Sequence, residues 1–246
     1  MGTVVVFDLE SDCTFDTCAG SCRQDKFRHM QITVACAMVL DSSLCTMPGT
    51  RDVAFSTAKA CHWWRDVAEK GKDPFEELLL LFDVADVIVG YNCLDFDFPL
   101  LRKHYGKGSG AHARYIGHRL KTIDPFSRIR ATLGTWPKLD DLLKANGLEP
   151  KTGDGRGAIR LWEQGFREEL LAYCASDVVA LTKMTLLASL EVPGYGRVGN
   201  GTFGIASALA AARVARVQEE ERGFWMHLLH RAAKTATWLW YPESSN

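Results

Sequence analysis

The chain of 246 residues lacks the features that would place it in several large classes of protein. It has no apolar run close to the roughly 20 residues that a membrane-spanning helix needs. Its formal net charge is −1 at pH 7, so any nucleic-acid-binding surface has to be local. It contains no internal repeat and no low-complexity tract. With 47% hydrophobic and 24% charged residues, the composition is that of an ordinary globular α/β protein.

The cysteines do not follow a disulfide pattern. Several of the eight lie in expected strands or helices, and the first strand is expected to start near Thr3, which leaves no room for a targeting peptide. We therefore expect an intracellular, reducing compartment, with cytoplasm and nucleus both open. Cys13, Cys18, Cys22 and His29 lack the paired spacing typical of zinc sites, so ordinary loop thiols are favoured and a zinc site stays open.

Hydrophobic periodicity predicts a mixed sheet with helices packed on it. We expect a domain over 1–190 and a C-terminal helical extension over 191–246, rich in Ala and Trp, that is a possible docking element. The expected strands are 4–9, 32–40, 44–47, 86–91 and 119–124. The expected helices are 58–67, 74–84, 94–105 and 166–190, with short helices between 125 and 164.

Carboxylates embedded in apolar sequence are the most informative residues. Asp8 and Glu10 are two apart at the end of the first strand, so their side chains point to the same face. Asp97 follows the strand that ends near Asn92, although Asp95 competes with it as the functional acid. Asp177 lies on the long helix. Unpaired charges in such surroundings are costly and require a cation, and oxygen ligands suit Mg²⁺ or Mn²⁺.

The third acidic segment contains a second functional candidate. Tyr173 and Asp177 are four apart, which places them on one face of a helix. Taken alone, this pair is more typical of a tyrosine at the core edge beside an exposed acid. Taken with the two earlier segments, it indicates a two-metal phosphodiester enzyme.

The motifs resemble those of the DEDD (DnaQ-like) 3′–5′ exonucleases, in the DEDDy branch. F-D-L-E at 7–10 matches the first motif of that family, and G-Y-N at 90–92 with F-D at 96–97 matches the second. Y-x-x-x-D at 173–177 matches the third, with tyrosine where the other branch has histidine. The spacing of the second motif is typical of family B polymerase proofreading domains. L-D-D-L-L at 139–143, G-D-G at 153–155 and L-W at 161–162, followed by the third motif, resemble stand-alone polymerase-like exonucleases.

The resemblance covers roughly residues 3–190 and implies an RNase H-like fold, a mixed five-stranded sheet flanked by helices. It also implies two divalent cations, Mg²⁺ or Mn²⁺, one held by Asp8, Glu10 and Asp177 and the other mainly by Asp8, with Asp97 acting through water. Tyr173 would orient the attacking water. The implied substrate is the 3′ end of single-stranded nucleic acid, DNA favoured over RNA, and the implied products are nucleoside 5′-monophosphates. DNA repair or proofreading is the corresponding role.

A basic tract follows the second motif. Eight Lys or Arg residues lie between 101 and 130, against one acid, Asp124. The tract is interpreted equally well as a phosphate track or as a solvated surface. The residues predicted to bind substrate are Leu9, Asn92, Phe96, Arg102 and Lys103.

A second reading stays open, in which the chain is a non-catalytic subunit that uses an exonuclease fold as a scaffold. Trp225, Trp238 and Trp240 of the C-terminal region would then contact a protein partner. The complete set of acids disfavours this reading. An RNase H-type endonuclease is disfavoured by the tyrosine of the third motif.

Overall fold

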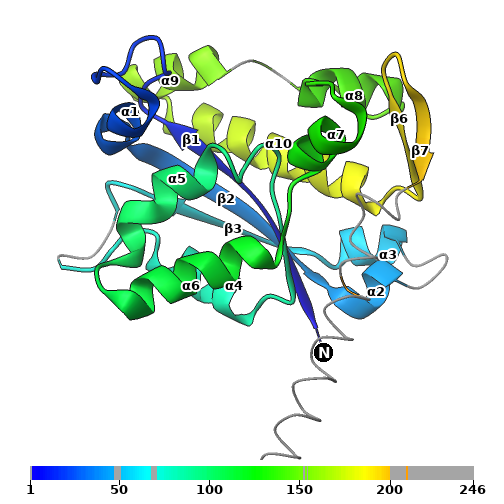
Figure 1. Ribbon diagram of the computed structural model, residues 1–246, viewed down its shortest axis with the longest axis horizontal. Coiled ribbons are helices and arrows are strands. Elements are labelled where there is room, and N and C mark those ends of the chain that lie inside the picture. The colour runs from blue at the N-terminus through cyan, green and yellow to red at the C-terminus, as the bar shows by residue number, and fades with distance from the viewer. Residues whose placement is uncertain are drawn as a thin grey trace, which may run out of the picture. The chain divides into compact units, whose positions relative to one another are not determined.

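A computed structural model describes residues 2–46, 51–67, 71–151, 153, 155–199 and 209. At its centre is a five-stranded sheet in the order β3-β2-β1-β4-β5 (Figure 1). β2 runs antiparallel to both β1 and β3, whereas β1, β4 and β5 are parallel. This is the predicted RNase H-like sheet. The strands are β1 (Thr3–Ser11), β2 (Ile32–Asp41), β3 (Lys59–Trp64), β4 (Val87–Val89) and β5 (Thr122–Ile123).

Helices cover both faces of the sheet and bury two separate apolar clusters (Figure 1). The long helix α10 packs on β1 and β2 from one side, while α4, α5 and α6 belong to the cluster on the other side. The helices are α1 (Arg23–His29), α2 (Ser42–Thr46), α3 (Arg51–Ser56), α4 (Glu76–Val84), α5 (Asp97–Leu101), the 3-10 helix η1 (Arg102–Tyr105), α6 (Ser109–Leu120), α7 (Pro125–Leu133), α8 (Leu139–Ala145), α9 (Gly155–Glu163) and α10 (Arg167–Leu186). No helix among the described residues is long and apolar enough to cross a membrane.

Strand β1 determines which side chains reach each face. Val4 and Val6 are buried in the cluster that contains α10, and Val5 and Phe7 are buried in the opposite one. The alternation predicted from the sequence is thus present, and it continues to the carboxyl end of the strand. Asp8 is therefore aligned with the face of the sheet that α10 covers.

The third strand was predicted in the wrong place. The segment expected as a strand near 44–47 begins as helix α2, because the Asp41 carboxylate accepts hydrogen bonds from the Ser43 amide (2.8 Å) and hydroxyl (2.6 Å). The edge strand is instead β3, where a helix was expected over 58–67. Its two tryptophans are typical of strands, and cross-strand pairing with β2 outweighs the weak helical pattern.

The strand conformation explains how two adjacent tryptophans both pack. Neighbouring residues of a strand point to opposite faces. The Trp64 ring stacks on Trp162 at a centroid distance of 6.4 Å, and the Trp63 indole N–H donates to Glu77 at 3.0 Å. Each tryptophan therefore contributes to a different layer of the fold.

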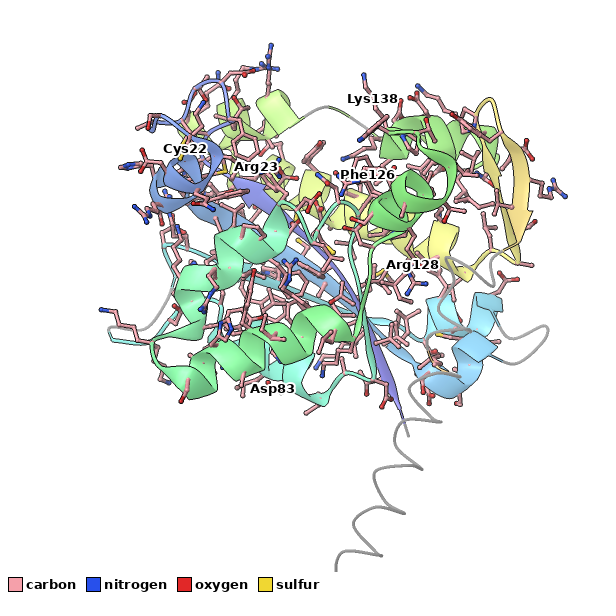
Figure 2. The ribbon with its side chains drawn as sticks, viewed as in Figure 1. Cys22, Arg23, Asp83, Phe126, Arg128 and Lys138 are labelled. Atoms are coloured by element: carbon pink, nitrogen blue, oxygen red, sulfur yellow. The ribbon has the colours of Figure 1, made fainter. Side chains whose placement is uncertain are left out.

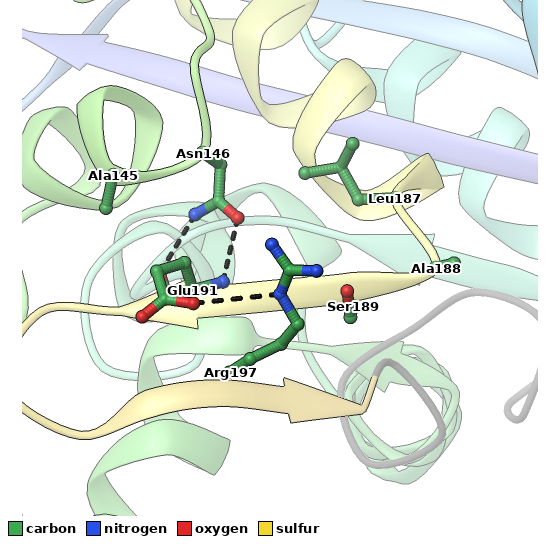
Figure 3. Close-up of a pocket in the computed structure, with 7 residues that line it drawn as sticks. All are labelled: Ala145, Asn146, Leu187, Ala188, Ser189, Glu191 and Arg197. Carbon is green, nitrogen blue, oxygen red and sulfur yellow. Dashed lines mark hydrogen bonds and ion pairs between the residues drawn. The ribbon is translucent and has the colours of Figure 1, made fainter.

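A β-hairpin follows α10. It consists of β6 (Ser189–Val192) and β7 (Gly196–Gly199), whereas the sequence predicted a helical extension from 191 onward. Asn146, at the end of α8, holds the hairpin by donating to the Glu191 carbonyl (2.9 Å) and accepting from the Glu191 amide (2.8 Å) (Figure 3). Apart from residue 209, the predicted extension beyond 199 lies outside the described residues.

Gly90 is required by sterics where β4 leads into the second motif. A Cβ added there would lie 2.6 Å from the Cys93 Cβ, 2.8 Å from its Sγ and 3.0 Å from the Phe7 ring. All three contacts are shorter than packed side chains tolerate, so the neighbouring backbone would have to move.

We expect Gly90→Ala to lower the free energy of unfolding by about 1–3 kcal/mol, because the added methyl group overpacks the core. Gly117→Ala is the control, since no atom lies within 4 Å of a Cβ added to that position in α6. It should raise stability by about 1 kcal/mol through helix propensity. Urea denaturation measures both changes, and equal effects of the two substitutions would contradict the steric argument.

Candidate metal centre

Four carboxylates from three distant segments meet at the carboxyl end of β1. Asp8 and Glu10 come from the strand, Asp97 is the first residue of α5, and Asp177 lies in α10. The electrostatic interactions are mutual: Asp8, Asp97 and Asp177 all act on Glu10, and Asp8 acts on Asp97. The structure therefore brings together the four acids that the sequence predicted.

Glu10, Asp97 and Asp177 are buried and Asp8 is partly buried, with one lysine as compensating charge at Asp177. Asp97 is 4% exposed and its Oδ1 has no hydrogen-bond partner among the described residues, whereas Asp177, 2% exposed, pairs with Lys151 through Oδ2. Unpartnered buried carboxylate oxygens are rare and require an explanation. Because the donor set consists of carboxylate oxygens, it fits hard divalent cations such as Mg²⁺ or Mn²⁺.

Burial and mutual repulsion shift the acids in the same direction. Burial, reinforced by the Asp177 carboxylate, raises the pKa of Asp8 to about 7. Burial, with the Asp8 carboxylate next in importance, raises the pKa of both Glu10 and Asp97 well above their ordinary values. Burial also raises the pKa of Asp177, while the Lys151 ammonium opposes that shift. A bound cation would remove the cause of these shifts by favouring the ionised forms.

The loop of the second motif is fixed by Asp124, a residue that the sequence reasoning counted only as a charge. Its carboxylate accepts from the amides of Asn92 (2.9 Å) and Leu94 (3.1 Å). It also caps α7, accepting from the Ser127 amide (3.2 Å) and hydroxyl (3.0 Å). Asn92 has a φ of 58°, a left-handed conformation that asparagine tolerates better than most residues. Asp124 therefore holds the turn that leads into Asp97.

Asp95, the competing acid, lies outside the cluster. Its carboxylate accepts from Arg130 at 2.9 Å, and its backbone carbonyl accepts from Arg23 at 2.6 Å. Its charge is thus compensated by an arginine. This geometry agrees with the choice of Asp97 as the candidate ligand.

Lys151 is the residue at the site that the sequence reasoning missed. Its Nζ lies 2.5 Å from Asp177 Oδ2 and 5.7 Å from the centre of the Tyr173 ring. Burial alone would lower the pKa of Lys151, but the Asp8 and Asp177 carboxylates outweigh it and raise that pKa. The lysine supplies one positive charge against the four carboxylates. Its position in a loop with no helical or strand pattern gave no signal in the sequence.

Tyr173 lies at the edge of the acid cluster. It is 8% exposed, and burial raises its pKa well above the ordinary value, so its hydroxyl stays protonated at neutral pH. A Cβ added to Gly153 would lie 3.4 Å from the ring, so Gly153 lies against the tyrosine side chain. A neutral hydroxyl in this position can orient a water molecule and is a poor base.

A cysteine, Cys174, also lies beside the acids. The Sγ of Cys174 lies within 4.8 Å of one carboxylate oxygen each of Asp8 and Glu10, the one such group among the described residues. The loop residues Cys13, Cys18, Cys22 and His29 form no such group, and all eight cysteines are free thiols.

The residues predicted to bind substrate have different surroundings. The Leu9 side chain is buried opposite the acids, while its backbone amide faces the carboxylates of Asp8 and Asp97. Phe96 packs edge-on against Phe15 at 5.7 Å and Phe27 at 6.0 Å.

The two basic residues of that set make contacts within the protein. Lys103 donates to the Met30 carbonyl at 2.6 Å, and the Arg102 guanidinium contacts His112 and lies over the Tyr115 ring. Their role in substrate binding stays a prediction.

The chain is similar in fold to known exonucleases and polymerases. It matches the family B DNA polymerase of Pyrobaculum calidifontis with 15% identity and a TM-score of 0.45 over 85% of this chain and 27% of that chain. It matches E. coli Exonuclease I, in complex with a dT13 oligonucleotide, with 15% identity and a TM-score of 0.45 over 76% of this chain and 41% of that chain.

The zinc-bound form of the E. coli Exonuclease I–ssDNA complex matches with 16% identity and a TM-score of 0.41, over 76% of this chain and 40% of that chain. This chain therefore spans less than half the length of these proteins. No protein-family model and no curated protein sequence matches the chain.

The raised pKa of Asp8 gives a signed prediction. A carboxyl group with a pKa of about 7 in the folded protein and 3.8 as its ordinary value binds more protons folded than unfolded between those values. Its contribution to stability therefore falls as the pH rises through that range. Without metal, Asp8→Asn should raise the melting temperature relative to the unmodified protein, and more at pH about 8 than at about 5.

Saturating Mg²⁺ should reduce that difference at the higher pH, because it stabilises the ionised Asp8 of the unmodified protein. Scanning calorimetry with a chelator and with Mg²⁺ measures both effects. A difference in melting temperature that does not depend on pH would contradict the assignment of Asp8 to a site where burial and a neighbouring carboxylate raise its pKa.

Proposed function

We propose that this chain is a metal-dependent 3′–5′ exonuclease that hydrolyses phosphodiester bonds at the 3′ end of single-stranded nucleic acid. DNA is favoured over RNA, and the products are nucleoside 5′-monophosphates. The observation that carries the proposal is the convergence of Asp8, Glu10, Asp97 and Asp177 beside Tyr173. The predicted role in repair or proofreading and the predicted reducing compartment are part of the same proposal, and the free thiols support the latter.

The four acids would hold two divalent cations, Mg²⁺ or Mn²⁺, one at Asp8, Glu10 and Asp177 and the other mainly at Asp8, with Asp97 as its outer partner. When bound, these ions supply an activated water and neutralise charge on the leaving 3′-oxygen. The Tyr173 hydroxyl donates a hydrogen bond that orients the attacking water. Glu10 would also contact the terminal 3′-hydroxyl.

Lys151 binds phosphate in this proposal. In the structure its ammonium pairs with Asp177, beside the Tyr173 ring. When the scissile phosphate occupies the site, the ammonium exchanges part of this contact for a nonbridging phosphate oxygen. A lysine acts there as a point charge that stabilises the additional negative charge of the transition state.

An aromatic cluster next to Asp97 suits the bases of a single strand. Phe96 and Phe27 both pack against Phe15, and the Arg23 guanidinium lies 5.1 Å from the Phe15 ring and 5.6 Å from the Phe27 ring. Figure 2 shows Arg23 at the start of α1. Aromatic faces combined with arginine bind single strands without strong sequence preference. The cluster therefore supports an unpaired 3′ end as the substrate.

Activity is tested with 5′-labelled single-stranded DNA and RNA in Mg²⁺ or Mn²⁺. We expect a ladder that shortens from the 3′ end, and we expect Asp8→Ala and Asp97→Ala to abolish it because each removes a metal ligand. Asp141→Ala, an exposed acid of α8, is the control and should retain activity. The absence of any metal-dependent product from either polymer would refute the proposal.

Lys151→Met tests the phosphate-binding role. We expect kcat/KM to fall at least about 10-fold, because a charged group that contacts the reacting phosphate is lost. Lys144→Met is a matched control, since Lys144 also contacts an aspartate, Asp140, at 2.5 Å but lies on the surface. It should leave kcat/KM unchanged. Equal losses in the two variants would show that Lys151 has no specific role.

A further inference from the structure

The sulfur of Cys174, a soft metal ligand, lies beside carboxylate oxygens, which are hard metal ligands. It is fully buried in α10, between Tyr173 and Asp177 in the sequence. Its Sγ lies 3.7 Å from the backbone carbonyl oxygen of Asp8. Sγ and one carboxylate oxygen each of Asp8 and Glu10 lie within 4.8 Å of one another. The thiol therefore belongs to the same small volume as the acids of β1.

The spacing of these three atoms suits a tetrahedral metal. Zinc binds sulfur at about 2.3 Å and carboxylate oxygen at about 2.0–2.2 Å, which separates two of its ligand atoms by roughly 3.5 Å. Metal binding would draw Cys174 Sγ and the two oxygens from within 4.8 Å of one another to that separation. Mg²⁺ and Mn²⁺ prefer oxygen ligands and are not stabilised by a sulfur ligand. The sulfur therefore favours the binding of zinc over that of Mg²⁺ or Mn²⁺.

A second observation points to a cation at this place. Asp97 Oδ1 is buried and lacks a hydrogen-bond partner among the described residues, whereas Asp177 pairs with Lys151 through Oδ2. Both side chains are more than nine-tenths buried, and both act electrostatically on Glu10. Asp97 and Asp177 therefore add negative charge where Asp8, Glu10 and the thiol meet, and Asp97 Oδ1 has no donor that a cation would have to displace.

We propose that Cys174 is a metal ligand for thiophilic cations, and that it lets Zn²⁺ or Cd²⁺ bind at Asp8 and Glu10 in a mode that Mg²⁺ does not use. On binding, the thiol loses its proton to solvent and the sulfur forms a bond to the metal. This bound ion competes with the activating cations and inhibits the enzyme. The inhibition rests on the proposed exonuclease function, whereas the binding does not.

The chain offers a matched control thiol. Cys45 is also buried, at 6% exposure, and its Sγ likewise donates to a backbone carbonyl, that of Asp41, at 3.3 Å. Cys45 belongs to no group of metal-ligating atoms among the described residues. Replacing it therefore tests for any general effect of losing a buried thiol.

The test measures metal–sulfur bonding directly. A parent protein with Cys13, Cys18, Cys22 and Cys61 changed to serine loses the four thiols that are not fully buried. Titration with Cd²⁺ is followed through the ultraviolet sulfur-to-cadmium charge-transfer band and by calorimetry. We expect one saturable band in the parent and in its Cys45→Ser variant, and we expect Cys174→Ser to lose the band and to bind Cd²⁺ at least about 10-fold more weakly.

Asp8→Asn in the parent should weaken the same band, which ties the sulfur to this site. A band of undiminished size in Cys174→Ser would overturn the proposal, as would its absence from the parent. Circular dichroism on each variant shows that it is folded.

Mg²⁺-dependent nuclease activity of the parent separates the two proposals. A cadmium band that depends on Cys174, in a protein without nuclease activity, refutes the exonuclease and supports the metal ligand. Activity without such a band refutes the metal ligand alone. With both present, Zn²⁺ should inhibit the parent at concentrations at least about 10-fold lower than it inhibits Cys174→Ser.

Discussion

The confinement of four carboxylates to one buried volume is the constraint on which the rest of this structure depends. Ionised together, they repel one another, and burial removes the water that would screen them. Several neighbouring features reduce this electrostatic cost or hold the acids in place. Lys151 supplies a positive charge at Asp177, the Leu9 amide faces two of the acids, and Asp124 fixes the turn before Asp97. A protein would not keep this arrangement for stability alone.

The sheet makes this confinement possible. β1 is paired with β2 along its whole length and with β4 over Val4–Val6, so β2 alone holds the carboxyl end that carries Asp8 and Glu10. The loop after β4 emerges at the same edge because parallel strands end together. α10 then covers the face to which Asp8 belongs. Three segments that are far apart in the sequence thus meet, and among the described residues Asn92 is the one non-glycine residue with a left-handed backbone.

The sequence predicted most of the site and the centre of the fold. Asp8 and Glu10 could be placed because a period of two on a buried strand leaves no ambiguity of face, and Tyr173 and Asp177 because a period of four defines a helix face. Lys151 could not be found, since its contact with Asp177 depends on the path of a loop. β3 was missed for a related reason: an edge strand is stabilised by pairing with β2, which local propensity does not report. Cys174 carried no pattern, because one buried thiol is usually a core residue.

The position of Asp124 links two parts of the molecule into one mechanical unit. A single carboxylate both starts α7 and holds the Asn92–Leu94 turn, so neither can move without stretching hydrogen bonds to the other. A rotation of α7 would be transmitted to Asp97 within a few ångströms, through covalent structure and four short contacts. The placement of Asp97, a candidate metal ligand, is therefore tied to the orientation of a helix that contributes no candidate ligand itself.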